Sequence, residues 1–129
     1  MTSPSPGALT TMRILAQDRT LRTVAAGEVI FRAGDAGESV FGIVDGEVRI
    51  DWAKGRDSEI LGPGSSFGVG ALVGTEHQRF GTATALQDTQ LLEMNREEFL
   101  FALQELPMFA LEMLQGLEER LGHLKPSGS

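Results

Sequence analysis

Apolar residues follow one period in the middle of the chain and another in its C-terminal third. Between Leu21 and about Met94, short strand-prone runs are separated by glycines at close intervals. In one run Val48, Ile50 and Trp52 alternate with polar residues, the period-two pattern of a half-buried strand. Many short strands with frequent turn signals predict an antiparallel barrel or sandwich.

Three more runs, residues 29–31, 40–44 and 89–94, are also predicted as strands. Asp45 and Gly46 lie between two strand-like runs, and both residue types tolerate a positive φ. They therefore predict a hairpin turn that makes these runs neighbours in one sheet.

Helical spacing appears on both sides of this middle region. Residues 8–17 carry apolar side chains three apart, which predicts a short amphipathic helix. At Asn95 the period changes again, and Asn95 is the expected N-cap, with Glu97 and Glu98 in the first turn. Apolar residues continue to Pro107, which is expected in the first turn of a second helix.

The second of these helices carries a leucine-rich seam of about two heptads, widened by Leu111 and Met113. Its members are Ala110, Leu114, Leu117, Leu121 and Leu124. The seam either packs onto the strands as core or pairs with another helix. Because the apolar arc is too wide for the strands alone to cover, we expect one side to pack and the other to meet a partner.

The net charge, the lack of cysteine and the lack of long apolar runs exclude several classes of function. The 129 residues include 18 acidic and 11 basic ones, giving a formal charge of -7, so no positive face for nucleic acid or an anionic membrane is expected. The lack of cysteine excludes disulfides, thiol catalysis and Cys-ligated metal sites. With no apolar run near about 18 residues and no secretory signal pattern, we expect a soluble cytoplasmic domain.

Three glycine-marked motifs follow one another at residues 27–35, 40–48 and 61–68. In this order they resemble the cyclic-nucleotide-binding domain of the catabolite-activator and protein-kinase-A regulatory families. The resemblance implies a mainly β fold, an antiparallel β-roll of jelly-roll type with an N-terminal helix and two C-terminal helices. The expected organisation is a tail over 1–7, a domain over 8–124 with its roll at about 21–94 and its helices at about 95–124, and a tail over 125–129.

The third motif leads into a stretch that resembles the family's phosphate-binding cassette, which supplies the candidate ligand-binding residues. They are Phe67, Gly68, Val69, Gly70, Ala71, Leu72, Arg79, Phe80, Gly81 and Thr82. The resemblance implies that Arg79 pairs with the phosphate of a cyclic nucleotide. It also implies that pocket occupancy shifts the helices after the roll.

Two cassette positions depart from the family pattern. Val69 stands where the family has a glutamate that accepts a hydrogen bond from the ribose 2′-hydroxyl. A hydrogen bond to a charged group contributes about 1.5–3 kcal/mol, so its loss predicts affinity lower by roughly tenfold to a hundredfold. Phe80 stands where the family has a small residue, and a ring inside the pocket would exclude the ligand. The last helix also ends near Leu124, about where the family's contacts to the base begin, so ordinary cyclic-AMP binding is expected to be weakened.

Several candidate groups have a structural interpretation beside the functional one. Arg79 either binds an anion or is satisfied by a neighbouring carboxylate or carbonyl. Four glycines either form an anion-binding nest of N–H groups or only serve turns. They are Gly68, Gly70, Gly74 and Gly81. His77 and His123 lie far apart in sequence and are expected at the surface, and no metal-ligand or catalytic pattern is found.

Three functions remain open at this point. The first is a non-catalytic regulatory module that acts through protein contact, tuned by an anionic or nucleotide ligand at Arg79. The second is a receptor for a cyclic nucleotide or another nucleotide second messenger, with altered specificity. The third is a structural or oligomerising domain whose pocket is closed. No enzyme activity, no metal and no certain cofactor are expected; the candidate ligand is a cyclic nucleotide or another phosphate-bearing molecule.

The expected partner is a second copy of the chain, another protein, or both. DNA binding is not expected, because the net charge is negative and no helix-turn-helix pattern follows the domain before Ser129.

Overall fold

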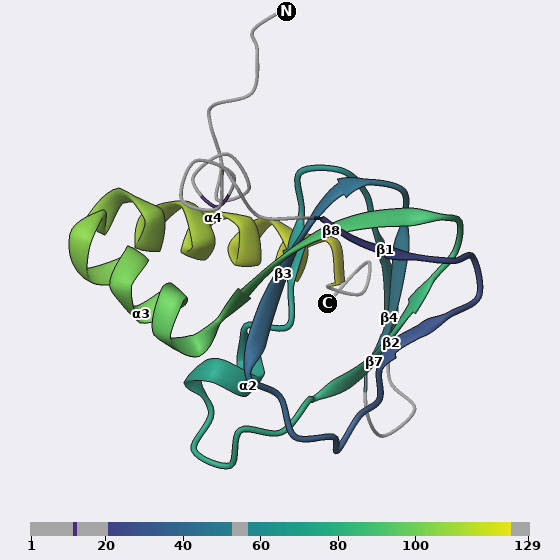
Figure 1. Ribbon diagram of the computed structural model, residues 1–129, viewed down its shortest axis with the longest axis horizontal. Helices are drawn as coiled ribbons and strands as arrows, with labels where there is room; N and C mark the ends of the chain where they lie inside the picture. The colour runs from purple at the N-terminus through teal and green to yellow at the C-terminus, as the bar shows by residue number, and fades with distance from the viewer. Residues whose placement is uncertain (1–11, 13–20, 53–56, 125–129) are drawn as a thin grey trace, which may run out of the picture.

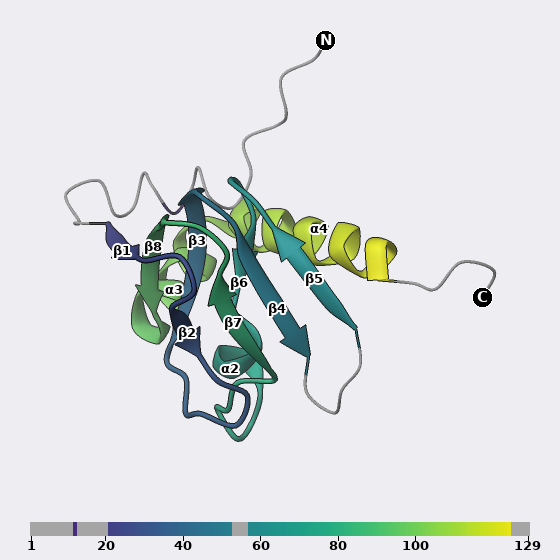
Figure 2. The same ribbon diagram turned by 90° about the vertical axis from the view of Figure 1, so that its right-hand side faces the viewer.

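The computed structural model describes Met12, residues 21–52 and residues 57–124, which form eight strands and three helices (Figures 1 and 2). The strands are β1 (Arg22–Val24), β2 (Val29–Phe31), β3 (Ser39–Asp45), β4 (Val48–Trp52), β5 (Ser58–Leu61), β6 (Ser66–Phe67), β7 (Gly81–Ala85) and β8 (Thr89–Asn95). The helices are α2 (Gly70–Val73), α3 (Arg96–Glu105) and α4 (Pro107–Leu124). Apart from Met12, the helix predicted over residues 8–17 lies outside the described residues, as do both predicted tails.

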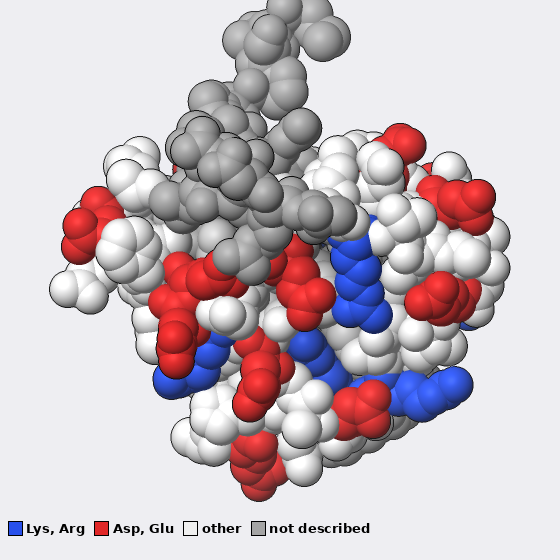
Figure 3. Space-filling view, in the orientation of Figure 1, with Lys and Arg blue, Asp and Glu red and all other residues white. Residues whose placement is uncertain are grey.

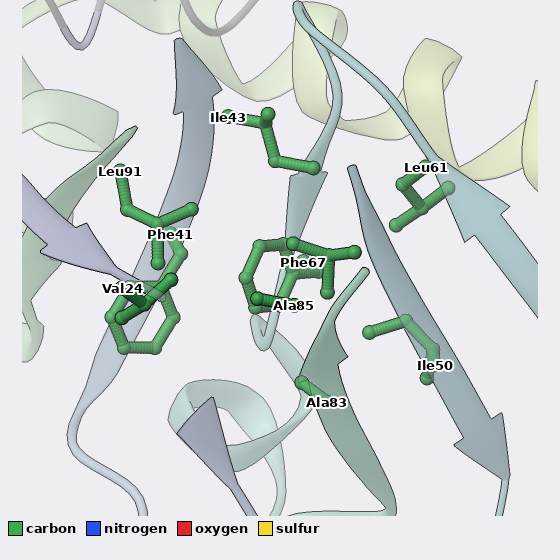
Figure 4. Close-up of a cluster of buried hydrophobic side chains, with 10 residues drawn as sticks. Val24, Phe41, Ile43, Ile50, Leu61, Phe67, Ala83, Ala85 and Leu91 are labelled. Carbon is green, nitrogen blue, oxygen red and sulfur yellow. The ribbon is translucent and has the colours of Figure 1, made fainter. Parts of the chain in front are cut away.

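The strands form two antiparallel sheets of four, in the orders β1-β8-β3-β6 and β2-β7-β4-β5. Ten buried side chains from the two sheets form the cluster between them (Figure 4). In β4, Val48 and Ile50 are buried in this cluster, as the alternating pattern predicts. The predicted fold class, an antiparallel β-roll followed by two helices, is therefore confirmed.

Asp45 and Gly46 do not close a hairpin, so that prediction is wrong. β3 pairs with β6 and β8, whereas β4 pairs with β5 and β7. The turn therefore carries the chain from one sheet to the other. Gly46 has a φ of 103°, and a Cβ there would lie 2.7 Å from the Cα of Thr89. Glycine is thus required by the tight passage between the sheets, and not by a two-residue hairpin.

A second buried cluster joins the helices to the outer face of the first sheet. Its members are Met12, Val40, Leu72, Leu92, Met94, Phe99, Ala102, Phe109 and Met113. β8 contributes to both clusters, because Leu91 faces the other sheet while Leu92 faces the helices. This alternation covers both faces of β8 and fixes α3 and α4 against the roll.

Both C-terminal helices begin where the sequence predicts. The Asn95 side chain accepts the N–H of Glu98 at 2.9 Å, and the Glu98 carboxylate accepts the N–H of Asn95 at 2.9 Å. This reciprocal capping box satisfies two backbone donors at the start of α3. α4 then begins at Pro107 and runs along the roll past β6 and β5 (Figures 1 and 2).

The leucine-rich seam of α4 lies mostly at the surface. The helix anchors itself through Phe109 and Met113, which are 0% and 5% exposed. Leu114 and Leu121 are 61% and 57% exposed, and Leu117 is half-buried. Ala110 is half-buried too, Leu111 is exposed, and the side chain of Leu124 lies outside the described part of the chain. α4 therefore packs on one side, as the sequence predicts, and leaves an apolar stripe open on the other; the partner expected on that side stays a prediction.

Candidate functional site

A cavity of about 330 Å³ lies where β2, β4, β5 and β6 meet the cassette and α4. Its lining residues are Phe31, Ile50, Trp52, Glu59, Phe67, Gly68, Val69, Gly70, Ala71, Val73, Arg79, Phe80, Gly81, Leu117, Arg120 and Leu121. Most of the wall is apolar, and three of these residues are charged: Glu59, Arg79 and Arg120. An apolar cavity with a few converging polar groups is the usual form of a small-molecule site.

Arg79 is the deepest charged group of the cassette, with 6% of its surface exposed. Its Nη1 donates to the carbonyl of Gly68 at 2.8 Å, whereas its buried Nε has no hydrogen-bond partner. Its backbone is pinned to the loop after β2, donating to the Asp35 carbonyl and accepting from the Gly34 N–H, both at 2.8 Å. One carbonyl thus satisfies part of the guanidinium, and one buried donor is left over.

The guanidinium of Arg79 packs against two aromatic rings and not against a carboxylate of the described residues. Its Cζ lies 4.2 Å from the ring centroid of Phe31 and 5.6 Å from that of Phe41. Among the described residues no carboxylate lies within ion-pair distance of Arg79. Burial lowers the pKa of Arg79, and the more distant charges of Glu93 and Asp35 oppose that shift. The positive charge is therefore not cancelled by an ion pair and remains available to an anion.

The structure brings most of the predicted cassette residues to the cavity wall. Those in the wall are Phe67, Gly68, Val69, Gly70, Ala71, Arg79, Phe80 and Gly81. Leu72 lies outside it, because α2 directs that side chain into the helix cluster. Thr82 also lies outside it, since its hydroxyl accepts the Ala33 N–H at 3.0 Å on the other side of β7.

Phe80 does not fill the cavity. Its side chain is 55% exposed and lies against the glycines of α2, so that a Cβ added at Gly70 would come within 2.7 Å of the ring. A Cβ added at Gly74 would lie 3.3 Å from the Cζ of the same ring. The two glycines make room for Phe80 at the rim, so the steric exclusion considered from the sequence does not arise.

α4 ends at Leu124, as the sequence predicts, and its residues already reach the cavity. Leu117, Arg120 and Leu121 all line the wall. The C-terminal part of the helix runs close enough along the roll to supply these side chains.

Arg120 ties α4 to the roll through a buried ion pair. Its Nε and Nη2 donate to the two oxygens of Glu59 at 2.9 and 3.1 Å, and its Nη1 donates to the Ser66 carbonyl at 2.8 Å. The indole Nε1 of Trp52 donates to the same carboxylate at 2.9 Å. The side chains of Arg120 and Glu59 are 14% and 9% exposed. Such a bidentate pair fixes the geometry of both groups.

Sequence reasoning did not identify Trp52, Glu59 and Arg120 as site residues. They come from β4, β5 and α4, and no local motif connects them. The strand that carries Glu59 was not predicted, and in the structure Glu59 lies opposite Ile50 and not Trp52, so the sequence offered no signal for this cluster.

The remaining candidates mostly have structural roles. The Gly74 N–H donates to the Gly70 carbonyl at 2.8 Å, and Gly81 pairs with Trp52 in the sheet, which favours the structural interpretation for these glycines. His77 and His123 are exposed, as predicted. No cluster of potential metal ligands and no helix able to span a membrane is found within residues 21–52 and 57–124. On the face shown in Figure 3 the basic side chains lie among acidic ones and form no large patch.

The family model of the cyclic nucleotide-binding domain matches residues 21–105. The chain belongs to the cyclic nucleotide-binding domain family. This domain is 34% identical over 104 residues to the cyclic AMP receptor protein of Thermus thermophilus, covering 78% of this chain and 48% of that protein. It is also 32% identical over 104 residues, 78% of this chain, to the lysophospholipase NTE1 of Coccidioides immitis, of which it covers 7%.

The domain thus spans about half the length of the receptor and a small part of the lysophospholipase. A solved chain from work on a cyclic-GMP-dependent signalling pathway in bacterial phytopathogenesis matches with a TM-score of 0.76 at 24% identity. The match covers 98% of both chains, and at that identity it establishes the fold.

Proposed function

We propose that this chain is a regulatory domain that senses a cyclic mononucleotide, with the phosphate bound at Arg79. The observation that carries the proposal is the buried guanidinium of Arg79, which lines an open cavity and forms no ion pair with a carboxylate of the described residues. Buried charges in proteins are usually paired, and an anion bound in the cavity would pair with this one. An open cavity also argues against the closed-pocket alternative.

The size of the cavity favours a mononucleotide. Small-molecule sites span roughly 300–1,000 Å³, and about 330 Å³ lies at the lower end of that range. A cyclic dinucleotide carries twice the bases and phosphates and needs correspondingly more space. Because Val69 offers no acceptor to a ribose 2′-hydroxyl, we expect affinity below that of family members that have the glutamate.

We propose that α4 transmits the effect of ligand binding from the cavity to a partner. Leu121 lines the cavity and is also 57% exposed, and Leu114 on the same helix is 61% exposed. A ligand that contacts the cavity side of α4 therefore acts on the helix that carries the open apolar stripe. The proposed partner on this stripe is a second copy of the chain.

Thermal unfolding with cyclic mononucleotides, cyclic dinucleotides and phosphate tests the ligand proposal. A ligand at about one hundred times its Kd adds roughly 2.7 kcal/mol to stability, which raises the midpoint of a domain of this size by several degrees. We expect a shift with a cyclic mononucleotide in the wild type and none in Arg79→Ala. Arg49→Ala is the matched control, since Arg49 forms a half-exposed ion pair with Asp51 and does not line the cavity. Equal shifts in wild type and Arg79→Ala would refute the proposal.

A further inference from the structure

Beyond Arg79, the charged groups in the cavity wall are Glu59 and Arg120, which are paired with each other. Both side chains line the cavity, so the hydrogen-bonding capacity that they have not used decides what this part of the wall can offer a ligand. The hydrogen bonds that Glu59 and Arg120 already make determine how many of their donors and acceptors remain.

Arg120 has more capacity left than Glu59. A guanidinium carries five N–H donors; Arg120 uses three of them, two on Glu59 and one on the Ser66 carbonyl. The two that remain are one on each terminal nitrogen. A carboxylate offers about four lone-pair positions, and Glu59 already accepts three bonds, two from Arg120 and one from Trp52. This part of the wall is therefore rich in donors.

The pair lies apart from the position proposed for the phosphate. Arg79 is anchored on the Gly68 carbonyl and Arg120 on the Ser66 carbonyl, two residues earlier on the same segment. Arg79 comes from the loop before β7 and Arg120 from α4, so the two guanidinium groups enter the cavity wall from different elements and hold separate positions in it. With phosphate at Arg79, the group that reaches Arg120 is the base.

We propose that Arg120, held by Glu59, makes this domain prefer guanine to adenine. The inference rests on the proposed function. The Hoogsteen edge of guanine presents two neighbouring acceptors, O6 and N7, which two parallel guanidinium N–H groups match. The same edge of adenine places the N6 amine, a donor, next to N7. Facing the donors of Arg120, that amine has no acceptor to replace its water.

Trp52 completes the arrangement by holding Glu59 from the other side. Its Nε1–H fills one position of the carboxylate that Arg120 leaves open, and the indole itself lines the cavity. Glu59 is thereby kept as the orienting partner of Arg120 and offers little to a base amine. Trp52 is also the single tryptophan of the chain, so its fluorescence reports on this part of the cavity.

The test is isothermal titration calorimetry of the full chain with cyclic GMP and cyclic AMP, in the wild type, Arg120→Lys, Glu59→Gln and Arg49→Lys. A good bidentate pair discriminates between bases by about tenfold or more, so wild type is expected to bind cyclic GMP tighter by at least that factor. Arg120→Lys keeps the charge but loses the planar fork, and should bring the ratio of the two Kd values close to one. Glu59→Gln should also reduce the preference for cyclic GMP over cyclic AMP, and Arg49→Lys should leave that preference unchanged.

The ratio is measured on one protein sample, so partial unfolding of a variant affects both nucleotides alike and leaves it unchanged. Equal or tighter binding of cyclic AMP by wild type, or an unchanged ratio in Arg120→Lys, would overturn the guanine preference while the nucleotide site stands. Binding of neither nucleotide by the wild type, or retention of both by Arg79→Ala titrated in the same way, would overturn the proposed function itself. Quenching of Trp52 fluorescence by cyclic GMP alone would support the placement of the base.

Discussion

The ring of Phe80 lies against Gly70 at the start of α2, where a Cβ on residue 70 would come within 2.7 Å of Cδ2 and 3.0 Å of Cε2. The departure at Phe80 is thus accommodated by a neighbouring glycine, and the ring stays at the rim of the cavity. The two positions are expected to be energetically coupled, since each sets the space available to the other.

The Gly70→Ala substitution tests that coupling. Alanine favours a helix over glycine by up to about 1 kcal/mol, so Gly70→Ala in a Phe80→Ala background should stabilise the domain. With Phe80 present the ring must move, and the same substitution should be less favourable by roughly 1 kcal/mol. Urea unfolding of the four proteins measures the coupling, and an additive cycle would contradict the contact.

Phe31→Leu is expected to destabilise the domain by about 1–2 kcal/mol. The substitution keeps an apolar side chain but removes the ring whose centroid lies 4.2 Å from the buried guanidinium of Arg79, and a desolvated cation–π contact contributes about 2 kcal/mol. Chemical denaturation measures the change. Phe101→Leu, at a ring that is 58% exposed, is the control and should stay within about 0.5 kcal/mol of wild type. Equal effects would show that the ring of Phe31 contributes packing alone.

Gly46→Ala is expected to cost more stability than Gly27→Ala. Both glycines have a positive φ, 103° and 86°, and left-handed backbone costs other residues about 1–2 kcal/mol. A Cβ at Gly46 would also meet the backbone of Thr89, whereas a Cβ at Gly27 would meet nothing within 4 Å. Gly46→Ala should therefore have a midpoint of thermal unfolding well below that of Gly27→Ala. Equal midpoints would mean that the crossing between the sheets has room for a side chain.

Asn95→Ala is expected to lower the free energy of unfolding by about 1 kcal/mol, because it removes the cap of α3. Asn95→Asp keeps an oxygen that can accept the Glu98 N–H and should retain most of that stability. Circular dichroism during urea titration compares the variants. A loss as large in Asn95→Asp as in Asn95→Ala would rule out the capping bond as the cause.

Leu114→Lys is expected to shift the chain from dimer to monomer without loss of stability of the folded monomer. Leu114 is 61% exposed on the open stripe of α4, so its apolar surface is already in water in a single chain. Ile60→Lys, at an equally exposed residue of β5, is the control and should leave the association unchanged. Sedimentation equilibrium measures both. A monomeric wild type would contradict the proposed pairing.

The sequence predicted those features that depend on neighbours along the chain. The alternation in Val48 and Ile50, the cap at Asn95 and the start of α4 at Pro107 follow from residues within one or two turns. The order of the motifs was sufficient to predict the β-roll. Asp45-Gly46 was a turn as expected, but its flanking strands join different sheets, because partner choice depends on long-range pairing.

The same distinction between local and long-range features applies to the residues of the candidate site. The sequence by itself determined that Arg79 stands at the position to which the family resemblance assigns the phosphate, and that Val69 and Phe80 depart from the family pattern. Only the tertiary structure decided that Phe80 turns onto Gly70, that α4 reaches the cavity, and that Glu59 meets Arg120. Residues 59 and 120 are 61 positions apart, and such a contact forms only when the roll and α4 pack together.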